Sequence, residues 1–100
     1  MKRPRTSLDL EAAETIAIAG LAFLAEDARR LGRFLAKTGV GPEELRENAR
    51  APRMLLAVVE HLLGDESLLL VFTASAGIAP ESVLPAYDLL ALEAARRERA

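Results

Sequence analysis

The chain has 100 residues, of which 51% are hydrophobic and 28% charged, and it contains no cysteine. These values describe one small globular domain and exclude a disulfide scaffold, a thiolate nucleophile and a cysteine-based zinc site. A single histidine, His61, excludes the usual multi-imidazole metal sites, and the formal net charge of −2 argues against broad adhesion to nucleic acid or to an anionic membrane.

The residue distribution predicts an all-α fold, because Ala and Leu dominate and apolar positions recur three and four residues apart. Residues 1–6 are interpreted as a flexible basic tail and residues 7–100 as a single helical domain. The longest stretch without a charge, residues 67–80, is only 14 residues long and contains Gly77 and Pro80. It is too short for a membrane span of about 20 apolar residues, so no membrane helix is expected.

The first helix is expected over about residues 8–26, with Ser7 or Thr6 as its N-cap. Its centre, residues 16–25, is apolar on every side. A helix of that kind belongs in the middle of a core.

Capping residues and helix breakers divide the remainder of the chain. Asp27 is a favourable N-cap for a second helix, which is expected to stop at Gly39, where glycine can take the left-handed conformation. Proline at a helix start and glycine at a helix end predict four further helices, at about 42–49, 52–63, 66–76 and 80–99. The last of these is expected either to kink or to restart at Pro85.

Two segments of the chain, 38 residues apart, have similar sequences, and each is expected to form a corner between two helices. Seven identities fall within 19 aligned positions, namely Asp27, Leu31, Phe34, Ala36, Gly39, Pro42 and Glu43 with Asp65, Leu69, Phe72, Ala74, Gly77, Pro80 and Glu81. Chance would give about one. The repeat predicts a bundle of about six helices built from two pseudo-repeated three-helix halves, with Phe34 and Phe72 buried at matching places. Alternatively, both corners share the ordinary rules by which helices end and begin.

Charge separates the two parts of the chain. Residues 29–53 carry seven basic side chains, whereas residues 54–95 carry six acidic side chains and no Lys or Arg. Complementary packing or solvated faces explain this separation, and so does a surface that steers a partner. The candidate interaction surface consists of Arg29, Arg30, Arg33, Lys37, Glu60, Asp65, Glu66 and Leu68.

Several separated segments carry a family resemblance. They include residues 12–15, 21–27, 31–35, 38–40, 65–70 and 76–78. Together they resemble a family of short bacterial proteins catalogued as a domain of unknown function, number 3572, over about residues 8–85. The resemblance implies a stand-alone bacterial protein of the cytosol, and it brings no activity, cofactor or assigned site.

No familiar catalytic motif is present in the sequence, so an enzyme is not expected and no cofactor is implied. His61 lies beside Glu60 and is interpreted as a histidine at the edge of the core rather than as a general base. Asp65 and Glu66 follow a glycine at a helix start, which favours capping over catalysis.

Two functions remain as hypotheses. Three strongly apolar segments, at 16–25, 54–59 and 68–72, exceed what a small core needs, which favours a protein-interaction or adaptor domain that binds a partner or a second copy of itself. The alternative is a nucleic-acid-binding domain, because the corner around Gly39 resembles a helix-turn-helix. Its second helix would present Glu43 and Glu44 to phosphates, so nucleic acid is the weaker hypothesis.

Overall fold

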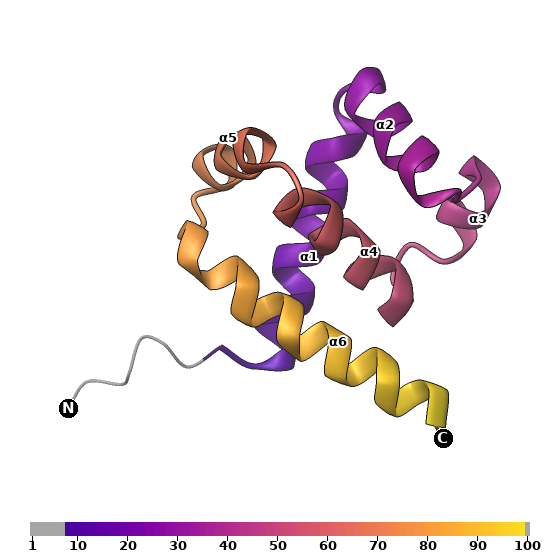
Figure 1. Ribbon diagram of the computed structural model, residues 1–100, viewed down its shortest axis with the longest axis vertical. Helices are drawn as coiled ribbons and strands as arrows, with labels where there is room; N and C mark the ends of the chain where they lie inside the picture. Colours follow the sequence, from indigo (N-terminus) through magenta and orange to yellow (C-terminus); the bar gives the residue numbers. More distant parts are fainter. Residues whose placement is uncertain (1–7, 100) are drawn as a thin grey trace.

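The computed structural model describes residues 8–99, which form six α-helices and one short 3-10 helix and contain no strand (Figure 1). In chain order these are α1 Leu10–Ala25, α2 Ala28–Thr38, α3 Pro42–Glu47, α4 Pro52–Leu63, α5 Glu66–Ala76, the 3-10 helix η1 Pro80–Ser82 and α6 Val83–Arg99. The all-α prediction is confirmed. The expected tail at residues 1–6 lies outside the described residues.

The start of α1 differs from the expectation. Its N-cap is Asp9, whose Oδ1 accepts a hydrogen bond of 2.9 Å from the backbone N–H of Ala12. Assigning the cap to Ser7 or Thr6 was therefore wrong. Aspartate caps as well as serine does, and its negative charge also suits the positive end of the helix dipole.

The other predicted boundaries agree closely with the structure, and the last helix shows what Pro85 does. Pro80 opens η1 and Val83 opens α6, so Pro85 lies in the first turn of α6 and the helix restarts before it. An N–H in that turn has no acceptor within the helix, so proline fits there without a kink.

The core lies where α1, α4 and α6 cross one another (Figure 1). Gly20 of α1 marks the closest approach, since a Cβ placed there would lie 2.9 Å from Cδ1 of Leu62 and 3.2 Å from Cγ1 of Val58, both on α4. Leu90 of α6 is fully buried against the same cluster. In Figure 1, α2 and α3 lie on one side of these three helices and α5 on the other.

A pseudo-two-fold arrangement of two whole halves is not shown. The two corners are alike locally, because Asp27 and Asp65 cap their helices and both Gly39 and Gly77 adopt the left-handed conformation. The helices that follow differ: α3 has six residues and buries none, whereas α6 has 17 residues and packs along α1 and α4.

The three strongly apolar segments differ in how deeply the structure buries them. α4 buries most of its large apolar side chains and α1 buries Ile16, Phe23 and Leu24, but α5 buries only Phe72 and Thr73. Leu70 and Val71 of α5 are 47% and 51% exposed. Within residues 8–99 no single helix is long and apolar enough to cross a membrane, and the one pair that meets this test jointly is bent by 108°.

Candidate functional site

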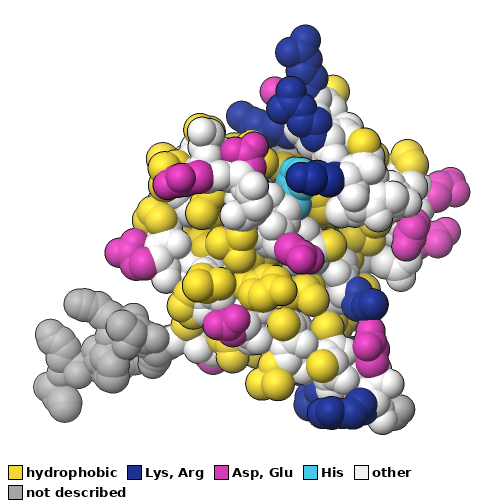
Figure 2. Space-filling model, in the orientation of Figure 1, with side chains coloured by type: hydrophobic (Ala, Val, Ile, Leu, Met, Phe, Trp, Pro, Cys, Tyr) yellow, Lys and Arg dark blue, Asp and Glu magenta, His cyan; other side chains and the backbone are white. Residues whose placement is uncertain are grey.

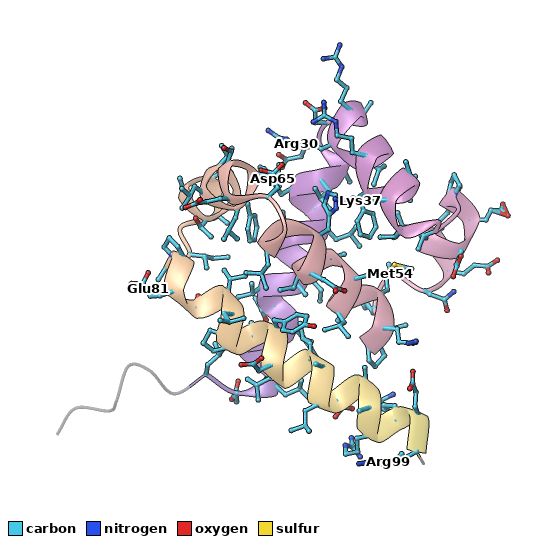
Figure 3. All side chains as sticks on the ribbon, in the orientation of Figure 1. Arg30, Lys37, Met54, Asp65, Glu81 and Arg99 are labelled. Atoms are coloured by element: carbon cyan, nitrogen blue, oxygen red, sulfur yellow. The ribbon has the colours of Figure 1, made fainter. Side chains whose placement is uncertain are left out.

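A surface hollow of about 370 Å³ lies between α2, the end of α4 and the start of α5. We call it the His61 hollow, and its lining residues are Arg30, Arg33, Ala36, Lys37, His61, Asp65 and Leu68. Figure 2 shows the histidine in cyan beside basic side chains in dark blue, and Figure 3 shows Arg30, Lys37 and Asp65 gathered at this end of the molecule.

The structure brings most of the candidate surface together. Arg30, Arg33, Lys37, Asp65 and Leu68 line the His61 hollow. Glu60 lines a neighbouring hollow of about 470 Å³ that shares Lys37 and His61 with the first. Arg29 and Glu66 line neither of these two hollows, although both side chains are exposed.

One face of α2 supplies the positive charge. Arg30, Arg33 and Lys37 are spaced three and four residues apart, which places them on the same side of a helix. Asp27 fixes where that helix begins, because its Oδ1 accepts hydrogen bonds from the N–H groups of Arg29 at 2.9 Å and Arg30 at 3.2 Å. These two bonds, that to Arg30 first, hold the pKa of Asp27 below its ordinary value.

Arg30 is held in place by α1. Its Nη1 donates a hydrogen bond of 3.2 Å to the carbonyl oxygen of Phe23, and its guanidinium carbon lies 4.0 Å from the centre of the Phe23 ring. The surface pair with Glu26 that helix spacing allows is not among the ion pairs of the described residues. A cation anchored over an aromatic ring keeps one orientation at lower entropic cost than a free arginine.

The cations of the His61 hollow have no acidic partner among residues 8–99. The ion pairs in this part of the chain join Arg53 to Glu98 and join Glu93 to both Arg96 and Arg97, all away from the hollow. Among the described residues Asp65 is the one carboxylate that lines the hollow, and its Oδ1 accepts a hydrogen bond of 3.1 Å from the N–H of Leu68. Positive charge is therefore in excess here.

His61 lies between the two hollows. It is half-buried and meets the ring of Phe34 edge-on, with ring centroids 5.4 Å apart. Burial lowers the pKa of His61, the charge of Lys37 lowers it further, and Asp65 acts in the opposite direction. At pH 7 the imidazole is mainly neutral and its ring offers one N–H donor.

The surroundings of His61 do not form a recognisable catalytic group. Thr38 lines the neighbouring hollow, but its hydroxyl donates a hydrogen bond of 2.8 Å to the carbonyl oxygen of Phe34. In the part of the chain that the structure describes, no side chain is hydrogen-bonded to His61, and no group of three metal-ligating side chains occurs. A general base needs a positioned proton donor within about 3 Å.

Sequence reasoning assigned His61 to the core edge and did not place it at the centre of the site. When the offset of 38 residues is extended upstream of the repeat, His61 corresponds to Phe23, which is buried. A polar ring at the position of a buried aromatic indicates that this end of α4 meets solvent.

The second helix of the α2–α3 corner presents acids to solvent. Glu43, Glu44 and Glu47 are all exposed on α3. A DNA-reading helix would place these side chains against the phosphates and base edges of the major groove.

Comparison with known proteins gives one family match. No curated protein and no solved structure matches the chain. The family model described as a protein of unknown function (DUF3572) matches residues 10–93. That match covers all of α1 to α5 and most of α6, and the chain therefore belongs to the DUF3572 family.

Proposed function

We propose that this chain is a non-enzymatic protein-interaction domain that binds an acidic segment of a partner at the His61 hollow. The observation that carries the proposal is the convergence of Arg30, Arg33 and Lys37 on one hollow without an acidic partner among the described residues. Unpaired cations repel one another, and an acidic partner removes that repulsion on binding.

The neighbouring surface supports the same proposal. Ala36 and Leu68 line the hollow, and α5, which begins beside it, exposes Leu70 and Val71 further along. Apolar side chains beside charged ones are typical of interfaces, in which apolar contacts supply affinity and charges supply orientation. The expected partner segment therefore combines carboxylates with at least one apolar side chain.

A second copy of the chain is the alternative occupant. Glu43, Glu44 and Glu47 on α3 offer the acids that such a copy would need, and Leu84 and Leu92 of α6 are 57% and 67% exposed. In such a dimer, α3 of each copy would bind the His61 hollow of the other, and this reciprocal contact gives a closed dimer. Sedimentation equilibrium at several protein concentrations distinguishes this case from a separate partner.

A cytoplasmic location is part of the proposal. The absence of cysteine agrees with a reducing compartment, where disulfides are rarely used.

The test compares two double charge reversals. Tagged wild-type protein, the variant Arg33→Glu/Lys37→Glu and the matched control Arg46→Glu/Arg50→Glu are each used to capture proteins from a bacterial lysate. The control makes the same charge change at exposed positions that do not line the hollow. The proposal expects one stoichiometric protein that the wild type and the control retain and the hollow variant loses.

Nuclease treatment of half of each lysate addresses the alternative. Recovery that disappears with nuclease would replace the proposal with nucleic-acid binding, despite the acids on α3. Equal recovery by the hollow variant and the control would show that the partner binds elsewhere and would contradict the assigned surface.

A further inference from the structure

We infer that the His61 hollow is a binding site for a phosphate monoester, held by Arg30, Arg33 and Lys37. The inference deepens the proposed function and rests on its use of this hollow. The shared chemistry is a doubly charged phosphoryl group, carried either by a phosphorylated side chain of a partner or by a free phosphorylated small molecule.

The charge of the hollow favours a dianion. Three cationic side chains and one carboxylate line it while His61 is mainly neutral, which leaves an excess of two positive charges. A phosphate monoester carries a charge of about −1.5 to −2 at pH 7 and presents three strong acceptor oxygens. A single carboxylate carries half that charge, so it would leave one cation uncompensated.

The donors suit a tetrahedral oxyanion. Arg30 is held by the carbonyl and ring of Phe23, so one guanidinium is already positioned before any ligand arrives. Arg33 and Lys37 follow along the same face of α2. Guanidinium groups make paired hydrogen bonds to phosphate oxygens, and lysine adds a compact charge.

The remaining lining groups define how the ligand fits. Asp65 repels an anion, but its Oδ1 is engaged by the N–H of Leu68 at 3.1 Å, so this carboxylate is tied to the start of α5. Ala36 and Leu68 contribute apolar surface, which lowers the local dielectric and strengthens the charged contacts. A hollow of about 370 Å³ has room for the phosphoryl group and for part of the chain that carries it.

His61 is a built-in reporter for this ligand. It is the only histidine in the sequence, so its ring protons are identified in a proton NMR spectrum without assignment. The charged groups facing it are Arg30, Arg33 and Lys37 from α2, Asp65 before α5, and Glu60 beside it on α4. A dianion bound among them stabilises the imidazolium and raises the pKa of His61.

The experiment follows the His61 ring protons in two arms. In the first, pH titrations in sodium chloride and in sodium sulfate of equal ionic strength are compared, because sulfate stays doubly charged across this range. Bound sulfate is expected to raise the midpoint by about one pH unit. In the second, phenyl phosphate is added at pH 7.5 and is expected to shift the resonance saturably.

Matched single variants locate the site. Arg33→Gln removes a lining cation and is expected to weaken phenyl phosphate binding about tenfold, the effect of losing one charge-assisted hydrogen bond. Arg46→Gln makes the same change on α3, away from the hollow, and is expected to bind like the wild type. No saturable shift, or equal binding by both variants, would overturn the inference.

Four further ligands identify the carrier of the phosphoryl group and test other anions in its place. A phosphoserine peptide that binds at least tenfold more tightly than phenyl phosphate identifies a phosphorylated partner, whereas equal affinity identifies a free phosphorylated small molecule. Tighter binding of acetate, of an unphosphorylated Glu-rich peptide or of a short DNA strand would overturn the phosphate assignment. If phosphate fails while the hollow variant still loses its protein partner, only this inference falls and the proposed function stands.

Discussion

Two helix corners, α2–α3 and α5–α6, share the same local sequence signals. Each has an aspartate N-cap, one fully buried phenylalanine and a glycine with positive φ, namely +76° at Gly39 and +69° at Gly77. Their central aromatic contacts are also reciprocal. Phe34 meets His61 and Phe72 meets Phe23, each pair with centroids 5.4 Å apart.

The two corners diverge in what they present to solvent. α2 presents four basic side chains, whereas α5 presents none and exposes Leu70 and Val71 instead. The buried phenylalanines, the aspartate caps and the left-handed glycines are shared by both corners and maintain the fold. The cations of the His61 hollow, Arg30, Arg33 and Lys37, stand at positions that differ between the corners, whereas Ala36 and Asp65 of the same hollow are shared.

The largest expected effect tests whether the two buried phenylalanines are equivalent. Phe34→Ala and Phe72→Ala should each lower the free energy of unfolding by about 3 to 5 kcal/mol, because each removes a fully buried ring and leaves a cavity. Urea unfolding followed by circular dichroism measures both losses. Since the total is about 5 to 15 kcal/mol, Phe→Leu variants serve if either alanine variant is unfolded.

Equal losses of unfolding free energy would show that Phe34 and Phe72 have equivalent roles in the core. A loss below about 1 kcal/mol at one of the two sites would contradict that equivalence, because a residue with that little effect is not part of a packed core.

Local signals made most of the fold predictable. Asp27, Asp65, Gly39, Gly77, Pro42 and Pro52 act within a few residues of their own position, and every helix boundary that they predict agrees with the structure within two residues. The packing of the helices against one another was harder to predict from the sequence. Whether α6 crosses both α1 and α4 depends on contacts between distant segments, and a pseudo-two-fold relation between the two halves is not shown.

A second prediction concerns the crossing of α1 and α4. Gly20→Ala places a methyl group 2.9 Å from Cδ1 of Leu62, a fully buried side chain that has little room to move. Overpacking of this kind costs about 1 to 3 kcal/mol, partly offset by the better helix propensity of alanine. We expect a net destabilisation of about 1 kcal/mol in urea unfolding.

Gly32→Ala is the matched control on α2. No atom of residues 8–99 lies within 4 Å of the added methyl group, so only the propensity gain remains. The protein should become more stable by about 0.5 to 1 kcal/mol. Stabilisation by both substitutions would mean that the crossing is looser than the distances indicate.

The candidate site was predictable in part, for a physical reason. Arg30, Arg33 and Lys37 share a helix face, which sequence spacing reveals. That Asp65 and His61 face them across a hollow depends on how α4 and α5 pack, which spacing does not reveal. The anchoring of Arg30 by Phe23 likewise joins two elements, α1 and α2, so helix spacing does not reveal it.

A third prediction compares the two aspartate caps. Asp27 accepts two backbone hydrogen bonds and Asp65 accepts one, so Asp27→Ala should destabilise the protein more than Asp65→Ala, which should cost about 1 kcal/mol. The lowered pKa of Asp27 adds a pH dependence: its contribution is present above the unfolded pKa and is lost as the pH falls through the folded value.

Thermal unfolding between pH 3 and pH 6 measures this dependence. The difference in midpoint between the wild type and Asp27→Ala should shrink toward the acid end. Glu93 will also contribute acid sensitivity in both proteins, because its hydrogen bonds from Arg97 and then Arg96 lower its pKa. A difference that stays constant with pH would contradict the capping role of the carboxylate.

The smallest expected effect comes from making the aromatic pairs alike, by His61→Phe. The pKa of His61 is lowered in the folded protein, mainly by burial, so the unfolded chain binds more protons between the folded value and about 6.5. Wild-type stability should therefore decline slightly as the pH falls from about 6.5 through the folded value, and then level off. In His61→Phe this decline should vanish.

Urea unfolding at pH 7.5 and pH 5.5 checks the prediction, with Tyr87→Phe as a control that leaves the histidine in place. A decline of equal size in His61→Phe would assign it to other groups. Added sulfate should favour the protonated form of His61 and so offset the decline in the wild type only, since the phenylalanine variant has no ring to protonate. The Phe23–Phe72 pair contains no titratable ring, whereas the Phe34–His61 pair does. Those two results would therefore link the protonation of His61 to the binding of an anion in the hollow.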